Sequence, residues 1–154
     1  MRATFLAGRI LFGGFFLYNG INHFKSRKQL SQYAASKNVP MSDAMVTMSG
    51  ILLVFGGTSI ALGVKPKLGA AAIIKFLAGV SPVMHDFWNV EDPNQRQGEM
   101  INFSKNMALL GAALALGSVP EPWPASLTPG REEGTTERSL TRMREQDDWV
   151  PVGL

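Results

Sequence analysis

The sequence predicts an all-α integral membrane protein, in which four transmembrane helices form a bundle that is followed by a disordered C-terminal tail. Two observations predict this fold class. Apolar residues gather into four long blocks within residues 1–119 of the 154-residue chain, and acidic residues gather after them. Residues 120–154 hold seven of the twelve acidic residues and four of the fifteen basic ones, so this Pro-rich and then charged tail has a formal charge of −3. The mean hydropathy of +0.05 is therefore an average over two unlike parts.

Each apolar block has the length that a bilayer requires. A hydrocarbon core about 30 Å thick is crossed by roughly 20 helical residues. Four such blocks would leave a soluble domain of this size too little polar surface to cover its core. Arg9 interrupts the first block and no small-residue cleavage pattern follows it, so we expect this block to be retained as a span. The predicted spans are residues 5–22, 44–63, 68–88 and 101–119.

The connections between the blocks predict an antiparallel arrangement. Residues 64–67 form a tight turn, which makes the second and third spans neighbours. A short interfacial helix is expected within residues 23–43, because a basic start leads into a helix-forming stretch that Pro40 ends. Prolines after Val119 end the last span. We call the membrane face with the N-terminus, the 64–67 turn and the tail side A, and the face with residues 23–43 and 89–100 side B.

The residue types exclude several chemistries. The chain has no cysteine, so it offers no thiol nucleophile, no disulfide and no thiolate ligand for zinc or an iron–sulfur cluster. Its two histidines are too few for a three-histidine zinc site. The basic residues flank the spans and no phosphate-binding glycine loop is present, which argues against a nucleic-acid partner. We therefore expect the lipid bilayer as a partner and no intrinsic cofactor, and residue chemistry alone assigns no reaction.

Polar side chains converge on side B, where two spans end and two begin. One interpretation is a site for the head group of a quinone or an anion, because imidazole and ammonium groups can donate hydrogen bonds to it. A second interpretation is interhelical hydrogen bonding with no ligand. A third is a haem held by the two histidines, which we expect to lie at equal depth on the first and third spans. The candidate ligand-binding residues are His23, His85, Trp88, Asn102, Lys105 and Asn106.

Two cations lie within the spans, closer to side A. Arg9 lies in the first span and Lys75 in the third, and neither has an acidic partner within a span near it. We expect both side chains to snorkel to lipid phosphates. Contact with one anionic lipid held between these two helices is the alternative.

Small residues and loop charges bear on packing and orientation. Pairs at helical spacing, such as Gly13 with Gly20 and Gly111 with Ala115, favour internal packing over a homodimer seam. Sides A and B each carry five basic residues, so the positive-inside rule does not decide between the two orientations. The charged tail favours an arrangement with both termini in the cytoplasm, since such a segment is easier to leave untranslocated.

Five motifs carry a family resemblance. They are Gly8-Arg9-Ile10, Tyr18-Asn19-Gly20-Ile21-Asn22-His23-Phe24, Lys65-Pro66-Lys67-Leu68-Gly69, Met84-His85-Asp86-Phe87-Trp88, and Asn102-Phe103-Ser104-Lys105-Asn106 with Leu109-Leu110-Gly111. Together they resemble the DoxX family over about residues 1–127. The resemblance implies a small four-helix protein of the bacterial inner membrane. The family name derives from a subunit of a thiosulfate:quinone oxidoreductase, some members are associated with redox-defence complexes, and many have no assigned activity.

The resemblance favours a membrane subunit or anchor of a quinone-linked oxidoreductase complex. Such a subunit would need a redox partner, and quinone would be the molecule that it holds. A small transporter or lipid-binding protein is one alternative. An assembly or scaffold protein without a ligand site is another, and it predicts that the polar cluster on side B closes on itself.

Overall fold

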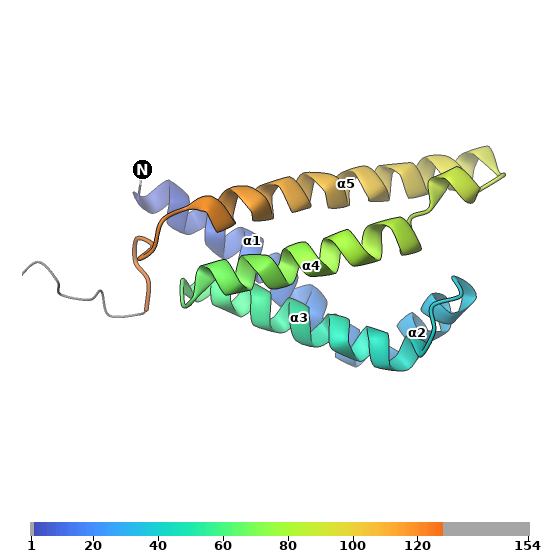
Figure 1. Ribbon diagram of the computed structural model, residues 1–154, viewed down its shortest axis with the longest axis horizontal. Helices are drawn as coiled ribbons and strands as arrows, with labels where there is room; N and C mark the ends of the chain where they lie inside the picture. Colours follow the sequence, from blue (N-terminus) through green and yellow to red (C-terminus); the bar gives the residue numbers. More distant parts are fainter. Residues whose placement is uncertain (1, 128–154) are drawn as a thin grey trace, which may run out of the picture.

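The computed structural model describes residues 2–127 and shows a helical bundle (Figure 1). The greater part of the predicted disordered tail, from residue 128 onward, lies outside the described residues. Within residues 2–127 the regular elements are all helical, which confirms the all-α prediction. They are α1 (Arg2–Lys25), α2 (Arg27–Ser36), α3 (Ser42–Leu62), α4 (Pro66–Met84), the 3₁₀ turn η1 (Phe87–Asn89) and α5 (Pro93–Ser118).

Three of the described helices are long and apolar enough to cross a membrane. These are Arg2–Lys25, Ser42–Leu62 and the segment Pro66–Asn89. The fourth predicted span lies within α5, which begins earlier than expected because Asp92 caps it by accepting a hydrogen bond from the Gln95 N–H at 2.8 Å. The half of α5 nearer to side B is polar, so this helix is the least membrane-like of the four long helices.

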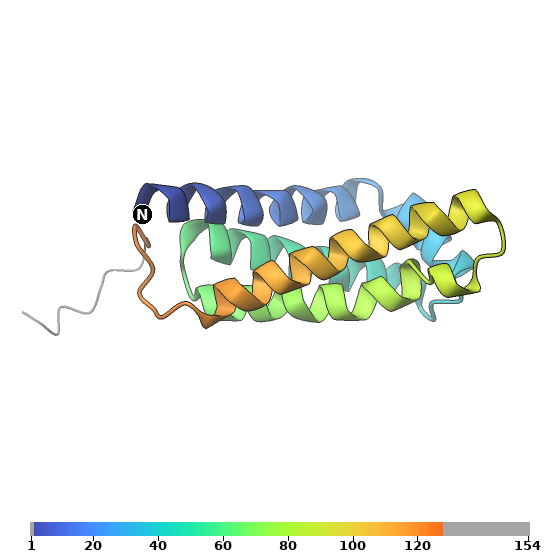
Figure 2. The ribbon, with the colours of Figure 1, turned by 90° about the horizontal axis from the view of Figure 1, so that it is seen from above.

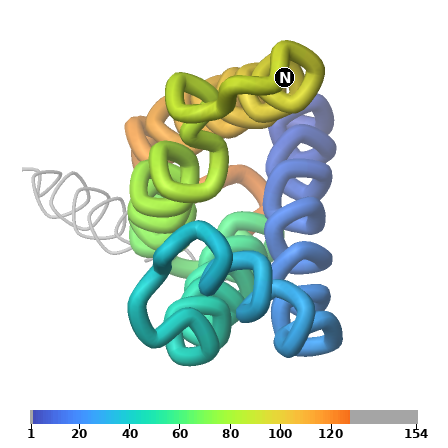
Figure 3. The backbone as a smooth tube through the Cα atoms, turned by 90° about the vertical axis from the view of Figure 1, so that its right-hand side faces the viewer, coloured from blue at the N-terminus to red at the C-terminus, as the bar shows by residue number. Residues whose placement is uncertain are grey.

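The four long helices run up and down in the predicted antiparallel order. In Figures 1 and 2 the N-terminus, the turn between α3 and α4 and the end of α5 lie at one end of the bundle, side A. Helix α2, η1 and the start of α5 lie at the other end, side B. Helix α1 packs on α3, α3 on α4 and α4 on α5, while α2 lies across α3. Figure 3 shows this order around the bundle axis.

Glycines allow α1 and α3 to pack closely. A Cβ atom on Gly13 would lie 2.5 Å from the carbonyl oxygen of Gly57, and one on Gly20 would lie 2.7 Å from the backbone nitrogen of Val54. In lipid, such close approach replaces the hydrophobic effect as the source of helix association. Gly13 and Gly20 therefore serve packing within the bundle, as predicted from the spacing of the small residues. Gly111 differs, because a Cβ there would meet no atom within 4 Å.

Candidate functional site

A mostly apolar pocket of about 450 Å³ lies between α1, α2, α3 and α4 in the half of the bundle nearer to side B. Helix α2 forms one wall of it, and the other walls come from α3, α4 and the last part of α1. Polar groups are few among apolar and methionine side chains, which is the usual composition of a small-molecule site. The polar lining residues are His23, Tyr33, Ser49 and Lys75, and the apolar ones include Leu30, Met45, Met48, Phe76, Val83 and Met84.

His23 presents one ring nitrogen that has no partner among the described residues. Its Nδ1 lies 2.8 Å from the backbone carbonyl oxygen of Asn19. A carbonyl oxygen only accepts, so Nδ1 carries the proton and, in the neutral ring, Nε2 keeps its lone pair. The ring packs edge-on against Phe76, with centroids 6.0 Å apart. His23 therefore offers the pocket a hydrogen-bond acceptor when neutral and a donor when protonated.

Tyr33 and Lys75 also belong to the lining. Burial raises the pKa of the Tyr33 phenol, and the carboxylate of Glu99, to which the hydroxyl donates, raises it further, so the hydroxyl keeps its proton at neutral pH. Lys75 is exposed on α4 and forms no ion pair within residues 2–127. Both residues are placed by helices whose other faces pack into the bundle.

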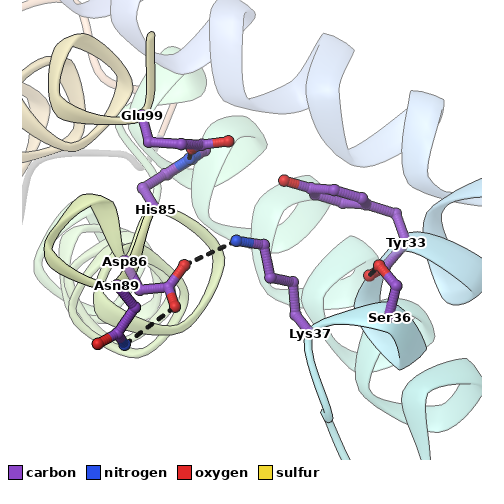
Figure 4. A network of polar contacts seen from close by, with 7 residues as sticks. All are labelled: Tyr33, Ser36, Lys37, His85, Asp86, Asn89 and Glu99. Atoms are coloured by element: carbon purple, nitrogen blue, oxygen red, sulfur yellow. Dashed lines mark hydrogen bonds and ion pairs between the residues drawn. The ribbon is translucent and has the colours of Figure 1, made fainter. Parts of the chain in front are cut away.

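A charged network lies on side B beside Tyr33, which lines the pocket (Figure 4). His85 Nδ1 lies 2.7 Å from Glu99 Oε2, which joins the end of α4 to α5. The Lys37 ammonium donates to Asp86 Oδ1 at 2.7 Å, which joins the end of α2 to the residue before η1. Its hydrogen bond to Asp86 raises the pKa of Lys37. Tyr33 points toward this network from α2 and thus lies between it and the pocket.

The structure does not gather the six predicted side-B residues into one cavity. His23 lines the pocket and His85 belongs to the network. Trp88 is 50% exposed and its ring packs against Phe87 and Phe103. Asn102 and Lys105 are exposed on α5, and Asn106 is half-buried. A ligand-binding role for these α5 residues stays a prediction.

The expectation that His23 and His85 lie at equal depth is wrong. The His23 ring contacts Phe76, and His85 follows Phe76 by nine residues. At about 1.5 Å per residue, this separates the two positions by roughly 13 Å along α4. The physical reason is that α4 continues toward side B past the level at which α1 ends. The two histidines therefore have separate partners, and this geometry does not fit a haem between them.

Three network residues were not predicted. Tyr33 and Lys37 are four residues apart at the end of α2, so they lie on the same side of the helix, and this spacing could have predicted that they act together. Glu99 was assigned to a loop, whereas the early start of α5 makes it helical. Without this extension of α5, Glu99 has no defined position relative to His85.

Arg9 does not snorkel to lipid, and that expectation is wrong. Its side chain is buried, with 2% of the residue exposed, and it lies against the segment that follows α5. Arg9 Nη1 donates to the Pro124 carbonyl oxygen at 2.9 Å and Nη2 to that of Ala125 at 2.6 Å. Its Nε has no partner among the described residues. The chain after α5 folds back over side A, so backbone carbonyls take the place expected for lipid phosphates.

The same segment seals side A with an aromatic side chain. Trp123 is 2% exposed and packs edge-on against Phe5, with ring centroids 5.2 Å apart. The Ser126 hydroxyl donates to the Gly63 carbonyl oxygen at 2.6 Å, and the Leu127 N–H donates to that of Leu62 at 3.2 Å. We call residues 119–127 the side-A cap.

Comparison with known proteins identifies the family. The family model named DoxX matches residues 4–86, which is more than half of the chain. The chain belongs to the DoxX family. The DoxX match spans α1 to α4 and ends at Asp86, so it includes all residues that line the pocket and leaves out α5. No curated protein and no solved structure matches the chain significantly. Family membership and the three apolar helices make it an integral membrane protein in contact with lipid.

Proposed function

We propose that this DoxX protein is a membrane subunit of a quinone-linked oxidoreductase in the bacterial inner membrane, with both termini in the cytoplasm. The observation that carries the proposal is the apolar pocket of about 450 Å³ on side B, with His23, Tyr33 and Lys75 among its lining residues. Volumes of about 300–1,000 Å³ are typical of small-molecule sites. The pocket lies wholly within the residues that match the family, so its residues are those in which a shared family function would reside.

The lining fits a quinone head group in shape and polarity. The head group is a flat apolar ring with two carbonyl oxygens, and its chain is apolar. Phe76 and the flexible side chains of Met45 and Met48 can pack against such a ring, since methionine adapts to irregular surfaces. Only the two oxygens of the ring need polar partners, and the lining offers a few polar side chains among many apolar ones.

The polar side chains of the pocket include a donor and an acceptor. The Lys75 ammonium donates hydrogen bonds, which suits a carbonyl oxygen of the oxidised ring. Neutral His23 accepts through Nε2, which suits a hydroxyl of the reduced ring. A bound quinone supplies two-electron, two-proton chemistry. The chain has no cysteine for a thiol or iron–sulfur relay, so we assign the electron donor to a partner subunit.

A steric variant tests whether the pocket holds the ring. Gly79 lines the pocket, and a Cβ there would meet no atom within 4 Å, so Gly79→Leu should fold and fill part of the space. Gly111→Leu on α5 is the matched control, because Gly111 is equally open and lies outside the pocket. The measurement is calorimetric titration of the full-length protein in mild detergent with a short-tailed benzoquinone. We expect Gly79→Leu to weaken binding at least about tenfold and Gly111→Leu to leave it unchanged.

Two results would count against the proposal. Quinone would be excluded as the ligand if the wild-type protein did not bind the benzoquinone and if mass spectrometry found no quinone in the lipid extract of the purified protein. Equal binding by the wild type and Gly79→Leu would place the quinone elsewhere on the protein.

The scaffold alternative has one observation in its favour. The side-B network satisfies its own charged groups, since Lys37 pairs with Asp86 and His85 with Glu99. A cluster that closes on itself is what an assembly protein without a ligand site predicts. Co-purification of an oxidoreductase with a wild-type protein that binds no quinone would favour this function over the one proposed.

A further inference from the structure

A second depression lies along a different face of α2 from the pocket. It is a shallow groove of about 590 Å³ between the end of α1, α2 and the start of α3. Leu30, Tyr33 and Ala34 line the apolar pocket, whereas the groove uses α2 residues at other helical positions. The groove residues are Phe24, Lys25, Arg27, Lys28, Ser31, Gln32, Ala35, Ser42 and Asp43.

One of the three basic groups in the groove is structural. Arg27 Nε donates to Asp43 Oδ1 at 2.7 Å, and its Nη2 contacts Oδ2, so the guanidinium holds the carboxylate with two bonds. The buried Ser31 hydroxyl donates to the same carboxylate at 3.2 Å. Two-point pairing of this kind fixes geometry as well as charge. It anchors the start of α2 to the start of α3 and neutralises both partners.

The other two basic groups have no acidic partner. Lys25 and Lys28 line the groove, and neither forms an ion pair within the described part of the chain. With Arg27 and Asp43 cancelling each other, the groove has a formal charge of about +2, taking each lysine as charged at neutral pH. The side chains of Gln32 and Ser42 add neutral donors beside this charge.

The groove lies where the helices leave the membrane. It is formed where the span α1 ends and the span α3 begins, so its lysines lie at the level of lipid head groups. Phe24 forms an apolar edge and is 45% exposed. A phosphate at the lysines with an acyl chain beside Phe24 matches this combination of charge and apolar surface.

We propose that the groove binds the phosphate of an anionic phospholipid through Lys25 and Lys28. The bound lipid holds the start of α2 in place from the groove, while Leu30, Tyr33 and Ala34 of the same helix keep their positions in the pocket wall. The occupant is a membrane lipid rather than a soluble anion, because the site lies at the bilayer surface and has an apolar edge. This proposal does not depend on the pocket holding a quinone.

Lipid competition tests the site on the full-length protein. The protein is exchanged into detergent micelles containing equal amounts of phosphatidylglycerol and phosphatidylcholine, and retained lipids are counted by native mass spectrometry. The test variant is Lys25→Gln with Lys28→Gln. The matched control is Lys65→Gln with Lys67→Gln, which removes two exposed lysines from the α3–α4 turn on side A. Circular dichroism melting of each variant checks that it is folded.

The expected result is a several-fold preference of the wild type for phosphatidylglycerol that the groove variant loses and the turn variant keeps. A wild type without preference would overturn the proposal. So would an equal loss in both variants, since that would indicate a general effect of surface charge. If the groove variant melts at a lower temperature, the test uses Lys25→Arg with Lys28→Arg, which keeps both charges. This folded variant must retain the preference for phosphatidylglycerol, and loss of that preference would also overturn the proposal.

Discussion

The two ends of the bundle are closed in different ways. On side A, residues of the cap contact the helices directly, and Trp123 and Arg9 are both 2% exposed. On side B a whole helix, α2, packs across α3, and a pocket and a groove lie on two of its faces. Side A is thus packed like a protein core, whereas side B leaves space of ligand size. We therefore expect side A to secure the fold, and it is on side B that we place the proposed binding sites.

The largest expected effect comes from removing the aromatic seal of side A. Trp123→Ala should destabilise the protein by about 3 kcal/mol, because a buried Trp leaves a cavity and loses its contacts. The measurement is unfolding in mixed micelles with increasing sodium dodecyl sulfate, followed by circular dichroism. Trp88→Ala is the control on side B, and we expect it to cost about 1 kcal/mol or less since Trp88 is half exposed. Equal losses would contradict the contrast between the two ends.

The next effect compares the two cations within the spans. Arg9→Met should cost about 2 kcal/mol, because it removes the two hydrogen bonds that the guanidinium donates to the carbonyl oxygens of Pro124 and Ala125, and bonds from a charged donor are stronger than neutral ones. Lys75→Met should cost nothing in the same unfolding assay, since Lys75 has no ion-pair partner to lose within residues 2–127. It should instead weaken benzoquinone binding. A Lys75→Met protein as unstable as Arg9→Met would show that Lys75 also has a structural partner.

The contrast between the ends also explains which features the sequence could predict. The apolar blocks and the 64–67 turn are local signals, and they predicted the helices and their antiparallel order. The partners of Arg9 are backbone carbonyls about 115 residues away, and every residue type has a carbonyl, so composition carries no signal for them. A site on side B that includes His23 was predicted, but most of the lining of the pocket was not, for a related reason. The lining depends on where α1 ends relative to α4, which the lengths of the spans do not specify.

A smaller effect concerns the link between α2 and the end of α4. Lys37→Met should loosen α2 without unfolding the bundle, because the Lys37–Asp86 pair joins these segments and both side chains remain partly exposed. The chain lacks cysteine, so spin labels on Gln29→Cys in α2 and Gln95→Cys at the start of α5, which packs on η1, report without interference the distance between α2 and this end of the bundle. We expect a broader distance distribution for Lys37→Met than for the wild type. The side-A variant Lys65→Met should give the wild-type distribution, and an unchanged Lys37→Met distribution would mean that the pair does not hold α2.

The smallest effect is a pH dependence of the same distance. The pKa of Lys37 is raised above its usual 10.5 by the bond to Asp86, and burial raises the pKa of Tyr33 above its usual 10.0. Both groups therefore bind their protons more tightly when α2 is docked. Their contribution to the stability of docked α2 is complete below the usual pKa values and is lost as pH rises through the raised ones. The distance distribution should stay constant from about pH 7 to 9 and broaden above about pH 10.5. Broadening already below about pH 9 would assign the docking of α2 to groups other than these two. In Lys37→Met the broadening at alkaline pH should be smaller, because only the ionisation of Tyr33 remains to cause it. The comparison with the wild type therefore separates the effect of Tyr33 from that of the Lys37–Asp86 pair.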